Sequence, residues 1–158
     1  MKLARVLLVL VAFTGCQSGG NTGMASEGVT LRMSIFAPSA LAEGAEGTVD
    51  VIVSNRGVGA VSNVLVDIAL PPQLTLVRES HGTGVSLIRD PHLLRYTVNG
   101  LGVGSDSRIS VTVRAQFGGA AETGEIRVIA QEPAVGGDHL ERTATIKRGQ
   151  YRPARSAG

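Results

Sequence analysis

Apolar residues recur at every second position in several separate runs from Val29 onward. The cleanest run lies at 108–115, where Ile109, Val111, Val113 and Ala115 alternate with polar or charged residues. A repeat of two places alternate side chains on opposite faces of a β-strand. Because one face of each strand is apolar and the other polar, each strand is expected to lie against a core on one side only, as antiparallel sheets allow. The pattern predicts an all-β chain.

The same repeat predicts seven or eight short strands separated by turns. Asn55-Arg56-Gly57 is expected to turn because Asn and Gly tolerate positive φ, and Pro71-Pro72 ends a strand because proline cannot donate to a ladder. In the last strand Arg142 would share the inward face with Ala144 and Ile146. The expected strands lie at 29–35, 49–54, 64–70, 74–77, 94–98, 108–115, 126–130 and 140–146. This arrangement indicates an immunoglobulin-like antiparallel β-sandwich over residues 29–147, with a closed barrel as the alternative.

The charge of the chain is concentrated at its two ends. The formal net charge is +2, but six of the 15 basic residues lie within the first five and the last twelve residues. Nine basic residues then face all 13 acidic ones, so the middle carries a net charge of −4. Nucleic-acid binding depends on neutralising phosphates, so this balance argues against a nucleic-acid partner. Aromatic residues make up only 3% of the chain, which does not favour an aromatic-lined cavity for a small molecule.

The N-terminal residues have the pattern of an export signal. Lys2 and Arg5 precede an unbroken apolar run at 6–13, which is shorter than the ~18 residues that span a bilayer. The run ends at Thr14-Gly15-Cys16, and Cys16 is the single cysteine of the chain. The segment FTGC at 13–16 resembles the lipobox of bacterial lipoproteins, although Phe13 stands where that family usually has Leu. The resemblance implies that residues 1–15 are removed and that Cys16 is lipidated.

A lipidated Cys16 would place the protein at the bacterial cell envelope, anchored to a membrane. Residues 16–28 would then be the lipidated cysteine and a flexible linker, because 17–28 are polar and rich in glycine. In Gram-negative lipoproteins a residue other than Asp after the lipidated cysteine usually directs the protein to the outer membrane, so Gln17 implies the outer membrane if the envelope is Gram-negative. Residues 148–158 are expected to be a basic disordered tail, with contact to anionic lipid as the alternative.

Two segments of the body resemble the conserved repeat domain of unknown function of bacterial surface proteins. This domain is an immunoglobulin-like relative of the bacterial cell-adhesion-related domain. The first segment, 49–77, contains an Asn-x-Gly turn at 55–57, an alternating strand and Leu70-Pro71. The second, 94–116, has a strand, a Leu-x-x-Gly turn at 101–104 and another strand. Ala69 departs from the family, which often has an acidic residue there. The resemblance implies a structural, adhesive or spacer module.

The residues that could carry chemistry are few. His81, His92 and His139 lack the spacing of metal ligands, although a loop-built site with Asp90 is an alternative. Gly57-Val58-Gly59 leads into a strand rather than a helix, so it is interpreted as a turn and not as part of a dinucleotide site. No Gly-x-Ser-x-Gly motif is present. We therefore expect no catalytic residue, no metal and no cofactor.

The outward arginines Arg95, Arg108, Arg114 and Arg127 have two interpretations. They could form a basic face for an acidic glycan, or they could be solvated and paired with residues across strands, which is the usual arrangement. Taken together, the sequence predicts a lipid-anchored envelope protein with a non-catalytic structural, adhesive or protein-binding domain. The alternative is an accessory subunit of a secretion or pilus machine that binds a partner's strand at a sheet edge. The expected partners are the membrane and another envelope or extracellular protein.

Overall fold

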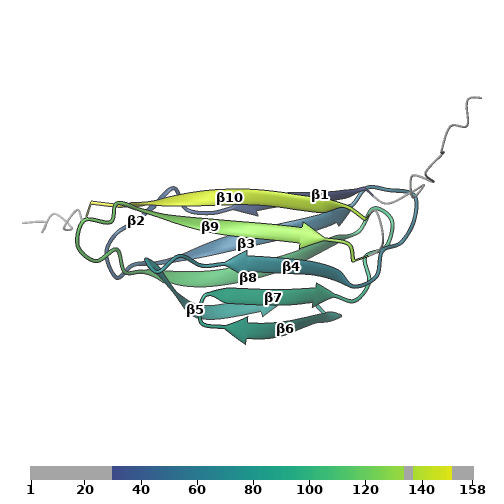
Figure 1. Cartoon of the computed structure of the whole chain (residues 1–158), viewed down its shortest axis with the longest axis horizontal. Coiled ribbons are helices and arrows are strands. Elements are labelled where there is room, and N and C mark those ends of the chain that lie inside the picture. Colours follow the sequence, from purple (N-terminus) through teal and green to yellow (C-terminus); the bar gives the residue numbers. More distant parts are fainter. Residues whose placement is uncertain (1–29, 134–136, 151–158) are drawn as a thin grey trace, which may run out of the picture.

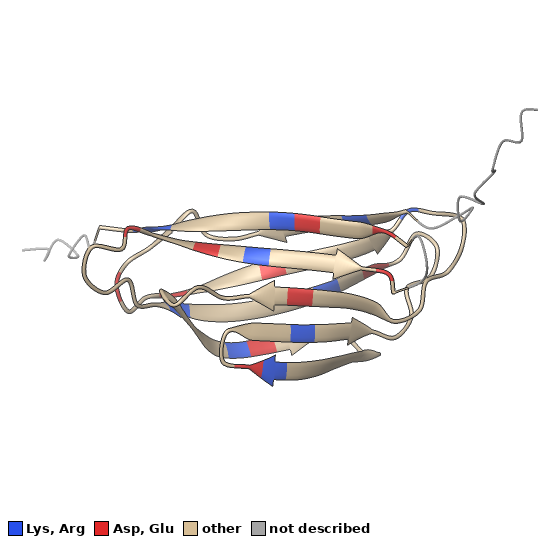
Figure 2. Ribbon diagram, viewed as in Figure 1, with Lys and Arg blue, Asp and Glu red and all other residues tan. Residues whose placement is uncertain are grey.

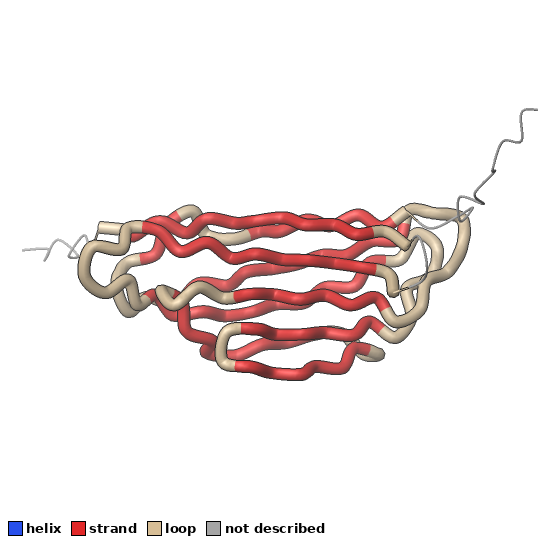
Figure 3. The backbone as a smooth tube through the Cα atoms, viewed as in Figure 1, coloured by secondary structure: helices blue, strands red, loops and turns tan. Residues whose placement is uncertain are grey.

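The computed structural model describes residues 30–133 and 137–150, and this part of the chain is a sandwich of two β-sheets (Figures 1 and 3). Its regular elements are ten strands, with no helix in the described ranges. None of these residues therefore forms a helix long and apolar enough to cross a membrane. The all-β prediction and the sandwich are confirmed. Because the two sheets stay separate, the closed barrel is wrong.

The smaller sheet has four antiparallel strands in the order β1-β3-β8-β5. The longest pairing joins β3 and β8, which lie at its centre. The bounds of its strands are β1 (Leu31–Phe36), β3 (Glu46–Asn55), β8 (Asp106–Ala115) and β5 (Leu74–His81).

The larger sheet has six strands in the order β2-β10-β9-β4-β7-β6. All its neighbours are antiparallel except β2 and β10, which run parallel over two residues. The bounds are β2 (Ala40–Leu41), β10 (His139–Arg148), β9 (Thr123–Gln131), β4 (Val64–Ala69), β7 (Leu93–Val98) and β6 (Val85–Asp90).

Ten strands replace the seven or eight that the sequence predicts. The strand β2 has only two residues, too few to show a repeat. In β6 the exposed Ile88 directly follows the half-buried Leu87, so two adjacent apolar residues hide the alternation. In β5 a bulge between Leu76 and Arg78 shifts the register, and the strand continues to His81 instead of ending at Val77. Bulges and edge strands are the features that a strict two-residue repeat misses.

The inward sets of alternating residues meet between the sheets as one core. Tyr96 and Phe117 are its largest fully buried side chains, and Leu101 closes one end at 3% exposure. The inward positions predicted for the strands at 49–54, 64–70, 94–98, 108–115 and 126–130 are all buried. Because no described residue is a cysteine, packing and hydrogen bonding hold this part of the chain together.

Arg142 lies on β10 at a position that pairs with the buried Val128, yet its side chain is exposed. Its Nη1 donates to the carbonyl oxygen of Glu141 at 2.9 Å. The strand β2 covers only the last two residues of β10, so Arg142 stands at an open edge where its side chain reaches water. A charge placed on the inward register of an edge strand opposes pairing with another chain.

Asn55 is completely buried and joins two loops at the end of the sandwich where β3 ends. Its Nδ2 donates to the carbonyl oxygens of Gly59 at 2.7 Å and Leu101 at 3.1 Å, and its Oδ1 accepts from the Gly57 N–H at 2.9 Å. Positive φ, the reason for expecting this turn, is absent from Asn55 and Gly57. The turn is held instead by a buried amide whose donors and acceptor are all used.

We predict that Asn55→Ala lowers the free energy of unfolding by about 2–4 kcal/mol. The change removes the partner of the Gly59 carbonyl and of the Gly57 N–H, and it removes one of the two hydrogen bonds to the Leu101 carbonyl, which still accepts from the Val61 N–H. Urea denaturation measures this as a lower midpoint with an unchanged slope. Asn99→Ala, at an exposed position after β7, is the matched control and should change the midpoint little. Equal midpoints for both variants would contradict the role of Asn55.

Candidate interaction surface

The outward residues of β1, β3, β8 and β5 form a broad polar surface, here called the four-stranded outer face. On β3 and β8 most of them alternate with core residues, and the strand register places the outward residues of all four strands in rows across the sheet. Charged residues of both signs lie along these strands (Figure 2). The face comprises Arg32, Ser34, Phe36, Glu46, Thr48, Asp50, Ile52, Ser54, Thr75, Arg78, Ser80, Arg108, Ser110, Thr112 and Arg114.

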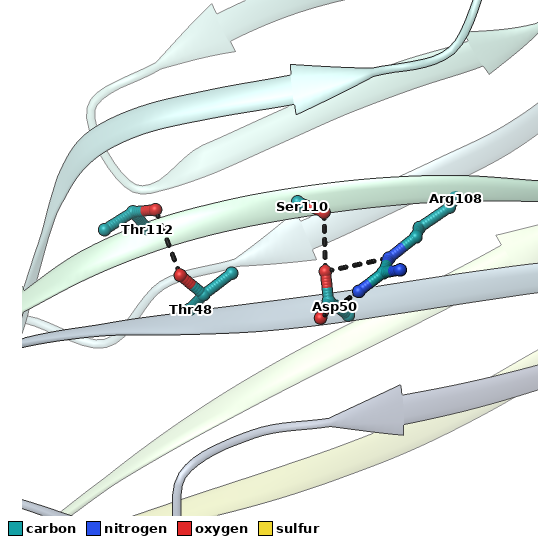
Figure 4. Close-up of polar contacts among 5 residues, drawn as sticks. All are labelled: Thr48, Asp50, Arg108, Ser110 and Thr112. Atoms are coloured by element: carbon teal, nitrogen blue, oxygen red, sulfur yellow. Dashed lines mark hydrogen bonds and ion pairs between the residues drawn. The ribbon is translucent and has the colours of Figure 1, made fainter.

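Asp50 lies at the middle of the four-stranded outer face, held by two residues of β8 (Figure 4). Arg108 donates through Nε to Oδ1 at 3.1 Å and through Nη2 to Oδ2 at 2.7 Å. Ser110 donates its hydroxyl to Oδ1 at 2.5 Å. The hydrogen bonds from Arg108 and then from Ser110 lower the pKa of the Asp50 carboxyl, against a smaller opposing effect of burial. The carboxylate is therefore a fixed charge in a fixed orientation.

Beside Asp50 the surface is low and built from small hydroxyl side chains. The hydroxyls of Thr48 and Thr112 lie 3.3 Å apart across β3 and β8 (Figure 4). Thr112 is only 6% exposed although it points away from the core, because its neighbours on β3 and β5 flank it. One step along the sheet, Arg114 Nη2 donates to Glu46 Oε1 at 2.6 Å. Cross-strand pairs thus fix the centre of this face before any partner arrives.

Three larger side chains stand at the rim of the four-stranded outer face. Phe36 ends β1 directly opposite Asp50 in the register and is 59% exposed. Arg32 on β1 and Arg78 on β5 are exposed, and neither forms an ion pair within the described ranges. Protein interfaces are enriched in aromatic residues and arginine, which supply most of the binding energy. The combination can anchor a partner at both edges of a rigid polar centre.

The four arginines that the sequence singles out do not form one basic face. Arg108 and Arg114 lie on the four-stranded sheet, whereas Arg95 and Arg127 lie on the six-stranded one. Arg95 contacts Asp67 through two hydrogen bonds of 2.8 Å, and Arg127 contacts Glu141 at 2.6 and 2.9 Å. Each of the four arginines is paired with a carboxylate on a neighbouring strand. Cross-strand pairing is confirmed, and the basic glycan-binding face is wrong.

The three histidines considered as metal ligands lie in different parts of the sandwich. His81 is the last residue of β5, His92 lies in the turn between β6 and β7, and His139 begins β10. Within the described residues, no three His, Cys, Asp or Glu side chains gather as a metal site. Cys16 and residues 151–158 lie outside the part of the chain that the structure describes.

Tyr96, Glu79, Arg89 and His81 form a second group of polar side chains, which the sequence pattern does not predict. Tyr96 is buried as predicted, and its hydroxyl has no hydrogen-bond partner. Burial first, and the charge of Glu79 second, raise the pKa of Tyr96 to about 12, while Arg89 opposes them. Arg89 forms an ion pair with Glu79 across the gap between β6 and β5. The ring of His81 meets Tyr96 edge-on at 6.0 Å.

A hollow lies at the end of the sandwich that is opposite to Asn55. It is lined by Glu43, Glu122, Arg148, Gly149 and Gln150. Charged and glycine residues supply most of its lining. It lacks the apolar walls and convergent polar groups of a typical small-molecule site. The four-stranded outer face therefore remains the main candidate surface.

Comparison with known proteins identifies the fold. No family model matches the chain, and no curated protein matches it. The RrgA Jo.In complex is similar at 10% identity and a TM-score of 0.58, over 76% of this chain and 79% of the other. The collagen-binding domain of a Staphylococcus aureus adhesin is similar at 8% identity with a TM-score of 0.52. The match covers 72% of this chain and 97% of that domain. A cohesin module of a Clostridium perfringens glycoside hydrolase is similar at 12% identity with a TM-score of 0.53. The match covers 76% of this chain and 97% of that module. The feature shared with these structures is the immunoglobulin-like β-sandwich fold.

We predict that Asp50 stabilises the protein in a pH-dependent way. Its pKa is lowered in the folded state, so its contribution is present above the unfolded-state pKa and is lost as the pH falls through the folded-state value. Asp50→Asn should cost about 1–2 kcal/mol of unfolding free energy at pH 7 and less at pH 3. Chemical denaturation at several pH values measures the difference. Glu125→Gln, exposed on β9, is the control, and a cost of Asp50→Asn that is constant with pH would contradict the assignment.

Proposed function

We propose that the chain is a lipid-anchored protein of the bacterial cell envelope whose immunoglobulin-like sandwich binds a partner protein and catalyses no reaction. The export signal and the FTGC segment at Cys16 support the anchor. The similarity to an adhesin domain and a cohesin module, and the motifs shared with the conserved repeat domain, support the binding role. The observation that carries the proposal is the four-stranded outer face, with the exposed Phe36 beside a rigid polar centre.

The composition of this face defines the chemistry of the partner. Burial of one aromatic ring removes about 150–250 Å² from water, so a partner needs an apolar recess for Phe36. Arg32 and Arg78 stand at opposite edges of the sheet and require carboxylates, since arginine binds a carboxylate with two parallel hydrogen bonds. Between them the partner meets hydroxyls and the fixed charge of Asp50. The partner surface is therefore polar, with acidic residues at its rim.

The six-stranded sheet offers a weaker surface. Its two outward arginines, Arg95 and Arg127, are already paired with carboxylates, and neither of the described aromatic side chains in or beside the core, Tyr96 and Phe117, reaches this surface. Ile88 is exposed there, but it lies on the edge strand β6. Breaking an existing ion pair to make a new one yields little net affinity. The four-stranded outer face needs no such exchange at Arg32 or Arg78.

The lipid at Cys16 is tested by the intact mass of the protein extracted from membranes of its source cell. We expect the mass of a chain that begins at Cys16 and carries acyl groups, because one acyl chain alone anchors a protein only marginally. A Cys16→Ser control should be found unacylated. An unmodified mass for the native protein would contradict the anchor.

The partner-binding face is tested by photocrosslinking in intact cells. A photoreactive phenylalanine analogue replaces Phe36, and the control places it at the exposed Thr143 on the six-stranded sheet. We expect one discrete adduct from position 36 and none from position 143. Adding Arg32→Glu and Arg78→Glu should abolish the adduct, because their charges would repel the acidic rim of the partner. Adducts from position 143 alone, or from neither position, would contradict the proposal.

A second function, strand addition within an envelope machine, is supported by β6. The Asn99 N–H donates to the Gly84 carbonyl at 2.8 Å, which fixes the alternation of backbone hydrogen bonds along β6 and β7. Val85, Leu87 and Arg89 therefore direct their N–H and C=O groups away from β7, at an open edge that can accept a partner strand. An adduct from the photoreactive residue at Ile88 and none at Phe36 would favour this function.

A further inference from the structure

The sequence Gly-Val-Gly occurs twice in loops of the sandwich, at 57–59 and 102–104. Val58 is 82% exposed and Val103 is 56% exposed. Flanking glycines have no side chain that could cover a valine, so both isopropyl groups stand in water. We call Val58 and Val103 the valine tips. Single exposed apolar residues are common on protein surfaces, whereas apolar residues gathered at one place can mark a contact site.

The two valine tips are held at the same end of the sandwich. The Asn55 side chain bonds to the carbonyls of Gly59 and Leu101, one in each loop, and its backbone oxygen accepts the Gly104 N–H at 2.9 Å. Val61 and Leu101 add a β-bridge between the loops. The valine tips are therefore presented by a fixed framework and need little ordering to make a contact.

The chain enters the sandwich at this same end. The Arg56 N–H donates to the Thr30 carbonyl at 2.8 Å, so residue 30 adjoins the loop that carries Val58. The described chain ends at residue 150 at the opposite end of the sandwich (Figure 1). As the flexible linker that the sequence predicts, the twelve residues 17–28 would span about 19 Å on a root-mean-square basis, which is short beside the sandwich. A lipid at Cys16 would hold this end near the bilayer.

We propose that the valine tips contact the lipid bilayer and orient the anchored sandwich with its N-terminal end against the membrane. The inference rests on the lipid anchor proposed above, because two valines bury too little apolar surface to hold a protein to a membrane. Arg56 is the basic residue in the loop that carries Val58. Because it pairs with Asp106 at 2.9 Å, it adds no unpaired charge beside the valine tips. The contact is apolar and does not depend on anionic lipid.

This orientation keeps the four-stranded outer face available. Phe36 is five residues beyond Leu31 on β1, which places it about 17 Å further from the membrane end. Arg32 lies near that end and Phe36 away from it, so a partner would approach from the side, above the bilayer. The lipid anchor and the valine tips would then set the height at which the partner is bound.

Depth-dependent quenching tests the contact in the lipidated protein. The sulfur of a lipidated Cys16 is blocked, so a new cysteine is the one reactive thiol of the chain. Val58→Cys, Val103→Cys and the control Ala120→Cys, in an exposed loop at the opposite end, each receive the same fluorophore. The proteins are reconstituted in phosphatidylcholine vesicles with brominated acyl chains. We expect at least twofold stronger quenching at positions 58 and 103 than at 120.

A further variant tests the contact without relying on the label. Val103→Asp in the Val58→Cys protein should lower the quenching at position 58, because a carboxylate resists entry into the bilayer. Equal quenching at all three labelled positions in a protein of lipidated mass would overturn the valine contact and leave the anchor in place. A protein without lipid would overturn both. Shielding of position 58 in whole envelopes but not in vesicles would overturn the lipid contact in favour of a protein partner.

Discussion

The buried amide of Asn55 fixes one end of this sandwich. Its hydrogen bonds join the loop after β3 to the loop before β8, and these two strands form the centre of the four-stranded sheet. A buried polar group with all its partners specifies one arrangement more sharply than apolar contact does, because each alternative leaves donors or acceptors unpaired. These hydrogen bonds also hold the loops that carry the valine tips next to residue 30. The orientation proposed at the membrane therefore depends on Asn55.

The strand alternation predicted most of the core, because burial on one face of a strand is a local property of the sequence. The strand at 108–115 shows this most clearly, since each of its inward residues is buried. The prediction fails at Ile88 and Arg142, because a strand at the edge of a sheet need not alternate strictly between buried and exposed residues. It also fails near Val77, where a bulge shifts the two-residue repeat.

The interaction surface could be predicted only in part. Outward arginines are visible in the sequence, but their partners are not, because the register between strands depends on the whole sheet. Asp50 and Arg108 are 58 residues apart, and Arg95 and Arg127 belong to the other face of the molecule. Asp50 and Glu46 pair with Arg108 and Arg114, so the remaining positive charge of the four-stranded outer face lies at its rim, at Arg32 and Arg78. What distinguishes the four-stranded outer face is Phe36 at its edge. Phe36 continues the outward positions of the first strand, but it lies one residue beyond the strand predicted at 29–35, so the sequence pattern does not single it out.

We propose that the four-stranded outer face, rather than the six-stranded one, meets the protein partner. Hydroxyl-radical footprinting of the protein in native envelopes, compared with the purified protein in detergent, measures this directly. We expect protection of Phe36 and of the outward residues of β3 and β8, with full exposure of the outward residues of β9 and β10. Protection of β9 and β10 with an exposed Phe36 would contradict it.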